Sequence, residues 1–162
     1  MEKYEIRRAV PADLERILDI YAYARRFMAE NGNPTQWAGG YPARSQLEED
    51  IRQEKLYAVT RYGKMHGVFY FAVGEDPTYA RIEDGAWRSN TPYGTIHRIA
   101  GDGSGGIFPA CLEFCLTRIG HIRIDTHHDN RPMQHVVEKH GFSRRGIIYV
   151  ADGSPRIAYD RV

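Results

Sequence analysis

The chain has 162 residues, a length that suits one domain with one sizeable hydrophobic core. Its 22 Lys and Arg against 21 Asp and Glu give a net charge of +1, which excludes a general electrostatic attraction to nucleic acid or to an anionic membrane. The N-terminus lacks the apolar run of a secretory signal, and no segment approaches the roughly 20 apolar residues of a spanning helix. We therefore expect a cytoplasmic protein with neither nucleic-acid nor membrane partners.

The first half of the chain contains predicted strands and helices. Tyr4–Val10 is a predicted strand, and Pro11 and Asp13 begin a helix because proline and an acidic residue suit a first turn. Apolar residues at helical spacing give this helix a core face, and Asn31 to Pro34 ends it. The residues of this face are Leu14, Ile17, Leu18, Tyr21, Ala24 and Met28. Further elements are a helix over Arg44–Glu54 and strands over Leu56–Tyr62 and Lys64–Val73, joined as a hairpin near Gly63.

The second half begins with a long polar connection, Glu75–Pro92, of a length that is often functional. Asp129 or Asn130 can cap a later helix that has Pro132 in its first turn and ends at Gly141. The other predicted elements are strands over Tyr93–Ala100, His121–Thr126, Phe142–Val150 and Arg156–Arg161, and a helix over Ile107–Ile119. This order predicts one domain over residues 1–162, of α/β (α+β) class, in which helices flank a mixed sheet.

A glycine-rich turn between residues 101 and 106 is the first candidate for a binding site. Its four glycines allow a tight turn whose backbone N–H groups reach a ligand without a blocking Cβ. The helix that follows adds free N–H groups and a positive end, so the segment suits a phosphate or pyrophosphate. A surface turn without a ligand is the alternative. No Gly-Lys-Ser/Thr follows, and the dinucleotide fingerprint is also lacking.

The segment after this helix carries a family resemblance. The strand His121–Thr126 leads to a helix headed by Asn130 that ends in Lys139-His140-Gly141-Phe142. This resembles the C-terminal half of the GNAT acetyltransferase superfamily, and the opening "IRRAVPADLERILDIY" is similar to its first strand and helix. The resemblance implies a mostly antiparallel sheet in which two central parallel strands splay apart.

The resemblance also implies a binding mode for acetyl-CoA as co-substrate. Its pyrophosphate would lie on the backbone amides of Gly103, Ser104, Gly105, Gly106, Ile107 and Phe108. The pantetheine arm would pair with the strand that ends in His97, Arg98, Ile99 and Ala100, and Asn130, Met133 and Gln134 would flank it.

Two positions depart from the family pattern. Phe108 is bulky where a small residue is usual in the loop, which makes cofactor contacts at that helix start less certain. Val137 stands where many members carry a tyrosine that protonates the departing thiolate, so that acid is missing from its usual place.

The implied reaction is acetyl transfer to a primary amine of an unidentified small molecule, by direct attack on the thioester. A base must accept the amine's proton, and a backbone N–H near Ile99 would stabilise the oxyanion. His97 is the first candidate base because imidazole titrates in the useful range, with Glu83 and Asp125 behind it. Each has a structural alternative: a histidine satisfied within the sheet, a solvated loop residue and a hydrogen-bond acceptor at a strand end.

Aromatic residues in the connecting segments are candidates for the acceptor pocket. Trp37, Tyr41, Trp87 and Tyr93 could give shape and hold a cationic amine, or could staple loops to the core. The histidines around His127 match no standard zinc spacing, and Cys111 and Cys115 read as core residues, so we expect no metal.

Two other functions stay open at this point. A catalytically silent acyl-CoA-binding module for sensing or assembly is favoured by Val137 and Phe108, and a nucleotide-binding domain rests on the glycine turn alone. The sequence identifies neither the acceptor nor the oligomeric state, for which a homodimer is one option.

Overall fold

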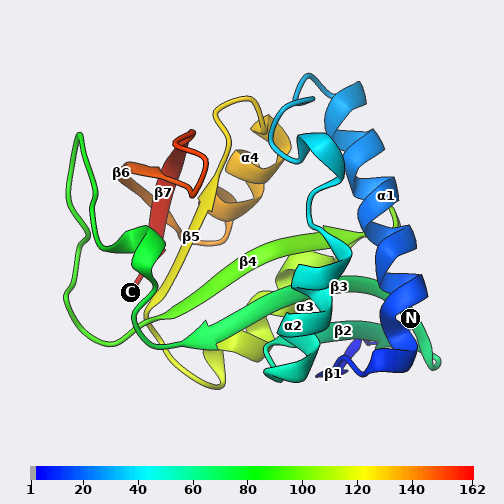
Figure 1. The fold of residues 1–162 in the computed structure, drawn as a ribbon. Helices are drawn as coiled ribbons and strands as arrows, with labels where there is room; N and C mark the ends of the chain where they lie inside the picture. The colour runs from blue at the N-terminus through cyan, green and yellow to red at the C-terminus, as the bar shows by residue number, and fades with distance from the viewer. Residues whose placement is uncertain (1–2) are drawn as a thin grey trace. The chain divides into compact units, whose positions relative to one another are not determined.

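The computed structural model describes residues 3–162, and its strands and helices follow the predicted order (Figure 1). Within these residues, no helix combines the length and the apolar composition that crossing a bilayer requires. The elements are β1 (Glu5–Arg8), α1 (Leu14–Glu30), α2 (Arg44–Arg52), β2 (Leu56–Arg61), β3 (Lys64–Val73), β4 (Gly94–Gly101), α3 (Ile107–Leu116), β5 (Ile122–Thr126), α4 (Arg131–Lys139), β6 (Ser143–Tyr149) and β7 (Pro155–Arg161).

The strands form a seven-stranded sheet in the order β1-β2-β3-β4-β5-β7-β6. The ladders β1–β2, β2–β3, β5–β7 and β6–β7 are antiparallel, and β4 pairs with β5 in parallel. The described parallel ladder joins Gly94 to Ile122 and Thr95 to Arg123, at the beginning of both strands. The predicted mixed, mostly antiparallel sheet with helices is therefore confirmed.

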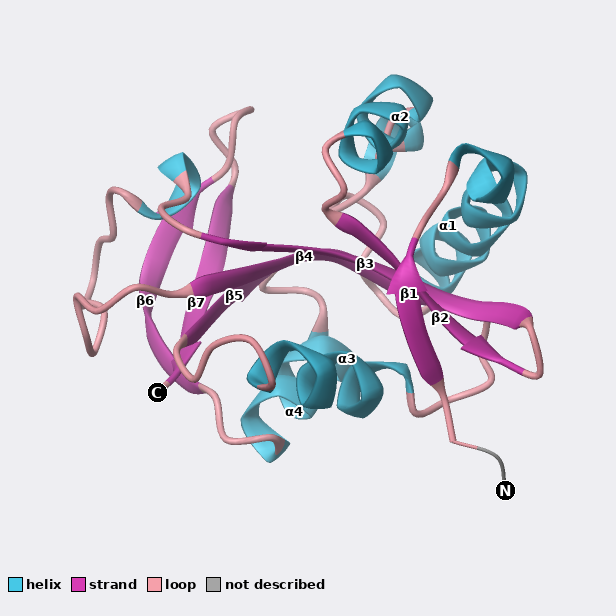
Figure 2. Cartoon of the chain, turned by 90° about the horizontal axis from the view of Figure 1, so that it is seen from below, coloured by secondary structure: helices cyan, strands magenta, loops and turns pink. Residues whose placement is uncertain are grey.

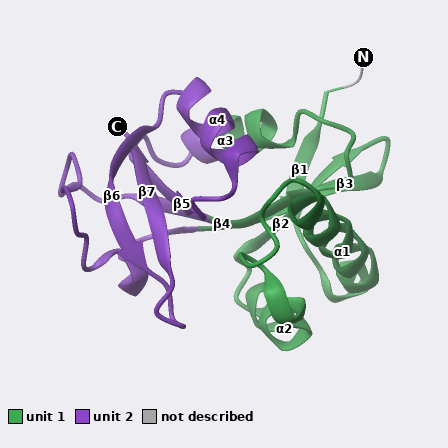
Figure 3. Ribbon diagram, turned by 90° about the horizontal axis from the view of Figure 1, so that it is seen from above, with its two compact units in different colours: residues 1–71, 97–114 green, residues 72–96, 115–162 purple. Residues whose placement is uncertain are grey.

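The chain forms two compact units (Figure 3). Unit 1 contains the described residues up to Phe71 together with His97–Phe114, and unit 2 contains Ala72–Ile96 and Cys115–Val162. Strand β4 therefore gives its first residues to unit 2 and the remainder to unit 1. Whether residues 1–162 act as one domain stays a prediction.

Unit 1 has a hydrophobic core on each face of its strands. Helices α1 and α2 lie on one face and α3 on the other (Figure 2). Successive side chains of a strand point to opposite faces of the sheet. Ala58 of β2 therefore packs in the core beneath α1 and α2, whereas its neighbour Tyr57 faces α3. The ring centroid of Tyr57 lies 5.4 Å from that of Phe69 and 5.0 Å from that of Phe114 on α3. The predicted core face of the first helix is confirmed, since Leu14, Ile17 and Tyr21 are buried. The other predicted positions, Leu18, Ala24 and Met28, are partly buried against the same core, and Ile20 is buried although it was not predicted.

Unit 2 has its own smaller core, and the segment predicted as a polar connection contributes to it. Tyr79 is 2% exposed and clusters with Tyr93, Ile148 and Ala158, and Trp87 packs against this cluster. The backbone of Glu83 also exchanges two hydrogen bonds with Ile147. The predicted connection over Glu75–Pro92 thus also contributes to the core, and the packing of Trp87 matches the alternative that it staples a loop to the core. The sequence did not reveal Tyr79, because the apolar residues of this segment are too widely spaced to give a periodic pattern.

Substitution of Gly146 tests the tight packing of β6. A Cβ built at this position would lie 2.5 Å from the carbonyl oxygen of Glu83 and 2.9 Å from a side-chain carbon of Ile82. Because the backbone must move to accept it, we expect Gly146→Ala to lower the free energy of unfolding by about 1–3 kcal/mol, measured by urea denaturation. Gly120→Ala is the control, since a Cβ there meets nothing within 4 Å. Equal stability of the two variants would contradict the packing described.

Candidate functional site

The glycine turn of unit 1 connects β4 to α3 in a conformation that requires glycine. Gly103, Gly105 and Gly106 have φ of 91°, 84° and 75°, a region that other residues rarely adopt. A Cβ at Gly103 would also lie 2.5 Å from the hydroxyl oxygen of Tyr23 on α1. All four residues from Gly103 to Gly106 are exposed to solvent, as a ligand-binding turn requires.

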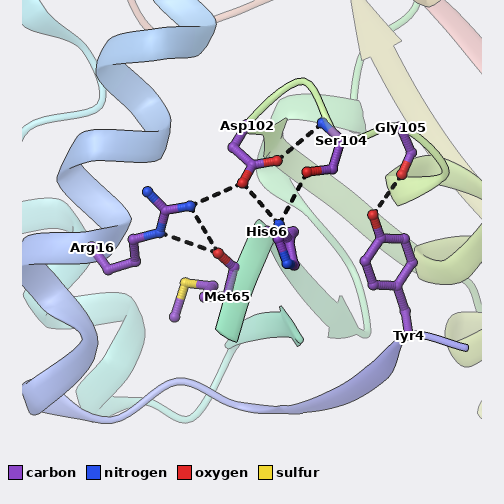
Figure 4. A network of polar contacts seen from close by, with 7 residues as sticks. All are labelled: Tyr4, Arg16, Met65, His66, Asp102, Ser104 and Gly105. Atoms are coloured by element: carbon purple, nitrogen blue, oxygen red, sulfur yellow. Dashed lines mark hydrogen bonds and ion pairs between the residues drawn. The ribbon is translucent and has the colours of Figure 1, made fainter. Parts of the chain in front are cut away.

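The carboxylate of Asp102 fixes the start of this turn (Figure 4). Its Oδ1 accepts a hydrogen bond from the N–H of Ser104 at 3.0 Å, and its Oδ2 accepts one from Arg16 of α1 at 2.9 Å. Nδ1 of His66 lies 2.9 Å from the same Oδ2. Because an unprotonated nitrogen would repel the carboxylate, we assign a proton to Nδ1 of His66. Burial alone would raise the pKa of Asp102, but the hydrogen bonds from Ser104 and His66 hold it below its ordinary value.

Further contacts hold the turn to other parts of unit 1 (Figure 4). Arg16 also donates two hydrogen bonds to the carbonyl of Met65, at 3.1 and 3.0 Å, and the N–H of Asp102 donates to the carbonyl of His66. The hydroxyl of Tyr4 donates to the carbonyl of Gly105 at 2.7 Å. The turn is therefore anchored to α1, to β3 and to the segment before β1. Sequence reasoning missed these anchors, because they are distant in the chain and carry no motif.

The contacts also show which groups of the turn are already bound within the chain or buried in the core. The N–H of Ser104 is taken by Asp102, so this residue offers its hydroxyl, which lies 3.0 Å from His66 Nδ1. Phe108 is 7% exposed, so its bulk lies in the core and not over the exposed turn. Its neighbour Ile107 packs closely on β3, where a Cβ at Gly67 would lie 2.7 Å from it. The main chain of the turn and the first turn of α3 is the candidate anion site.

The last residues of β4, which were predicted to pair with pantetheine, also lie in unit 1. His97 is half-buried, with its ring centroid 5.5 Å from that of Tyr70. Arg98 has a φ of 52° and pairs with Asp50 of α2 at 2.6 Å. Burial raises the pKa of Asp50, and the guanidinium of Arg98 opposes that rise. Ile99 is half-buried and Ala100 is buried.

The two other candidate bases are engaged within unit 2. Glu83 forms an ion pair with Arg81 and accepts a hydrogen bond from Tyr149 at 3.3 Å. Asp125 accepts a hydrogen bond from the buried hydroxyl of Tyr79 at 2.7 Å. This contact matches the structural alternative for Asp125, a hydrogen-bond acceptor in a strand. The role of each as a base stays a prediction.

The four aromatic candidates divide between the units. In unit 1, Trp37 is 8% exposed and lies edge-on to Tyr21 at 5.5 Å, whereas Tyr41 is 37% exposed. In unit 2, Trp87 and Tyr93 enclose the guanidinium of buried Arg123, at 4.1 and 3.9 Å from the ring centroids. Those two rings thus already hold a cation of the chain itself, while Tyr41 offers an exposed aromatic surface.

The start of α4 in unit 2 is built around Asn130. Its Oδ1 accepts a hydrogen bond from the N–H of Met133 at 3.2 Å, so Asn130 is the N-cap that the sequence predicted as one of two options. The side-chain amide of Gln134 donates to the carbonyls of His127 and His128. Val137 is 1% exposed in this helix. Cofactor contacts of Asn130, Met133 and Gln134 stay predictions.

One histidine-rich group in unit 2 bears on the metal question. Potential ligand atoms of His127, His128 and Asp129 lie within 4.8 Å of one another. However, Nδ1 of His127 already accepts a hydrogen bond from the N–H of Asp129 at 3.0 Å. This hydrogen bond engages one ring nitrogen of the group, and the expected absence of a metal stays a prediction.

The lowered pKa of Asp102 gives a pH-dependent prediction. The folded chain keeps this carboxylate ionised to lower pH than the unfolded chain, so its stabilisation is complete above the ordinary pKa of 3.8 and is lost as pH falls through the folded-state value. We expect Asp102→Asn to be less stable than the wild type by about 1–3 kcal/mol at pH 7, by denaturant unfolding. The difference should shrink as pH falls below 3.8 and through the folded-state pKa, where the carboxylate becomes protonated. A difference independent of pH would contradict the ionised network.

Comparison with known proteins bears on the family. No protein-family model and no curated protein matches the sequence. Among solved structures, a GNAT-family acetyltransferase from Streptococcus agalactiae is 29% identical, with 98% of this chain and 95% of that chain covered and a TM-score of 0.86. A putative acetyltransferase from Staphylococcus aureus is 24% identical over 96% and 97% of the two chains, with a TM-score of 0.68.

A third solved structure, AAC(6')-Ib in complex with ribostamycin and coenzyme A, shares the fold at 19% identity. It covers 99% of this chain and 94% of its own, with a TM-score of 0.66. The likeness to these acetyltransferases spans nearly the whole of both chains in each comparison. The chain therefore belongs to the GNAT superfamily.

Proposed function

We propose that the protein transfers the acetyl group of acetyl-CoA to a primary amine of a small molecule, by direct attack of the amine on the thioester. The observation that carries this proposal is the glycine turn of unit 1, held open and exposed by the carboxylate of Asp102. The fold supports acyl transfer in general. The acyl donor, the amine and the residues below are the proposed part.

The main chain of the turn suits the diphosphate of coenzyme A. Gly103, Gly105 and Gly106 have positive φ, a conformation that lets backbone N–H groups converge on an anion, and the N-terminus of α3 adds its positive end. A similar structure, AAC(6')-Ib, was solved with coenzyme A, which favours the same class of donor here. The negative charge of Asp102 does not oppose such binding strongly, because Arg16 neutralises it.

The end of β4 supplies the groups for the chemistry. An alkyl amine with a pKa near ~10 is mostly protonated at neutral pH, so it must lose a proton before or during attack. His97 is the proposed acceptor of that proton, directly or through water. The N–H of Ile99 is the proposed donor to the oxyanion of the tetrahedral intermediate. When the intermediate collapses, the thiolate of coenzyme A leaves. Because a thiol is a tolerable leaving group, turnover does not require a tyrosine at the position of Val137.

A catalytically silent acyl-CoA-binding module is the second candidate. The observation that favours it is Val137, a buried apolar side chain where many relatives carry the acid. Binding of acetyl-CoA without amine-dependent release of coenzyme A, over a broad panel of amines, would support this candidate over the first.

Gly105→Ala tests the binding turn. Gly105 has a φ of 84° and nothing within 4 Å of its Cβ position, so alanine adds backbone strain without a clash. A turn that relaxes out of this conformation should bind acetyl-CoA about tenfold more weakly, by isothermal titration calorimetry. Gly153→Ala is a matched control, because Gly153 has a φ of 85° and equally open surroundings but lies between β6 and β7. The turn is not the cofactor site if both variants bind like the wild type.

His97→Ala tests the proposed base. We expect kcat for the best amine to fall by about 10²–10⁴-fold, while the Kd for acetyl-CoA changes little. The loss should be smaller at high pH, where more of the amine is already deprotonated. A variant with wild-type kcat would remove His97 from the mechanism.

A further inference from the structure

Arg98 stands out in unit 1 because of its backbone conformation. Four non-glycine residues have positive φ in residues 3–162, and of these Glu54, Tyr62 and Asp84 lie outside the strands. Arg98, with φ of 52°, lies inside β4. A residue with a Cβ rarely adopts this left-handed region, and it persists there only when its surroundings hold it.

The side chain of Arg98 is held by a buried ion pair. Its Nη2 donates to Oδ2 of Asp50 on α2 at 2.6 Å, and both side chains are 9% exposed. The guanidinium also lies 4.7 Å from the ring centroid of Tyr70 and donates a long hydrogen bond, 3.4 Å, to the hydroxyl of Tyr41. Breaking a buried ion pair leaves an uncompensated charge, so this contact resists any movement of Arg98.

The carbonyl of the same residue is held separately, from α1. The hydroxyl of Tyr21 donates a hydrogen bond to the carbonyl oxygen of Arg98 at 2.7 Å. Tyr21 is fully buried, and burial raises the pKa of its hydroxyl far above the ordinary value, so it stays a donor at every relevant pH. A strand carbonyl ordinarily accepts from a neighbouring strand, whereas this one accepts from a helix side chain.

A planar peptide transmits this contact to the next residue. The carbonyl of Arg98 and the N–H of Ile99 belong to one peptide group, and in a trans peptide they point in opposite directions. A hydroxyl that fixes the oxygen therefore fixes the direction of the Ile99 N–H. This is the N–H that the proposed reaction uses to stabilise the oxyanion.

We infer that Tyr21 and Asp50 are positioning residues for acyl transfer: Asp50 holds Arg98 in the left-handed conformation, and Tyr21 orients the peptide that carries the Ile99 N–H. This inference rests on the proposed function. It assigns a catalytic purpose to two helix residues that are otherwise a core tyrosine and a partner in an ion pair. An oxyanion donor is effective only when it is aimed before the charge develops, which is the property that these contacts supply.

Tyr21→Phe is the first test, because it removes one hydroxyl and retains the ring. We expect kcat to fall about tenfold or more, with the Kd for acetyl-CoA within about twofold of the wild type. Tyr159→Phe is the control, since Tyr159 is also buried and donates to Glu138 at 2.9 Å, away from β4. If Tyr21→Phe loses stability like the control but retains wild-type kcat, the hydroxyl is structural and the inference is overturned.

A second test separates backbone conformation from the ion pair. Asp50→Asn/Arg98→Gly and Asp50→Asn/Arg98→Ala both lack the guanidinium and the buried carboxylate, and only glycine adopts the left-handed conformation without strain. We expect the glycine variant to retain about tenfold more kcat than the alanine variant. If the Asp50–Arg98 ion pair only attaches α2 to β4, the two double variants should lose kcat equally. That result would overturn the role of Asp50.

A readout independent of turnover separates this inference from the proposed function. The ¹H–¹⁵N resonance of the Ile99 amide should move, and its hydrogen exchange should become faster, in Tyr21→Phe compared with the wild type and Tyr159→Phe. An unchanged Ile99 amide overturns the inference even if the wild type acetylates amines. If the Ile99 amide changes in Tyr21→Phe but the wild type acetylates no amine, the positioning contact is supported and the proposed function is rejected.

Discussion

The carboxylate of Asp102 is the contact on which the candidate site depends. It joins a residue of α1, a residue of β3 and the amide of Ser104 to the start of the glycine turn. Glycines alone give a turn freedom, and freedom has an entropic cost when a ligand binds. Anchored by Asp102 and Tyr4, the turn has its open shape before a ligand arrives. Arg16 pairs with the acidic side chain and so reduces its repulsion of an anion at the proposed site.

A similar arrangement occurs earlier in the chain, at Arg98 within β4. There, too, the main chain leaves the regular strand conformation and is held by side chains from the helices. In unit 1, side chains of α1 and α2 therefore hold the conformation of a short stretch of main chain, from Arg98 to Gly106. Backbone amides are donors of fixed charge and direction, and a reaction that depends on them needs few catalytic side chains. In the proposed function, backbone amides and not a general acid support the reaction, which agrees with Val137 at the usual acid position.

The fold could be predicted from local patterns, whereas the anchors of the site could not. The order of strands and helices followed from periodicity, from Pro11 and Asp13 at a helix start and from Gly63 in a hairpin. The glycine turn was visible because its conformation depends on residues that are neighbours in sequence. The anchors of the turn are not neighbours: His66 and Asp102 are 36 residues apart, and Arg16 and Asp102 are 86 apart.

Other residues were found, but with their contacts unknown. Tyr21 was predicted in the core from its helical spacing, yet nothing in that spacing shows where its hydroxyl donates. Trp87 and Tyr93 were chosen as aromatic groups able to hold a cation, and the cation that they enclose in unit 2 is Arg123. Residue type can thus indicate the kind of contact, while the partner depends on tertiary structure.

Amide chemical-shift mapping of coenzyme A on the labelled protein tests the central claim most directly. The account predicts that the largest changes fall on Gly103, Gly105, Gly106, Ile107 and Phe108, followed by Ile99, and that the amide of Ser104 changes less because Asp102 already binds it. Saturable binding whose changes lie outside this stretch, or no change at saturating coenzyme A with the protein folded, would contradict it.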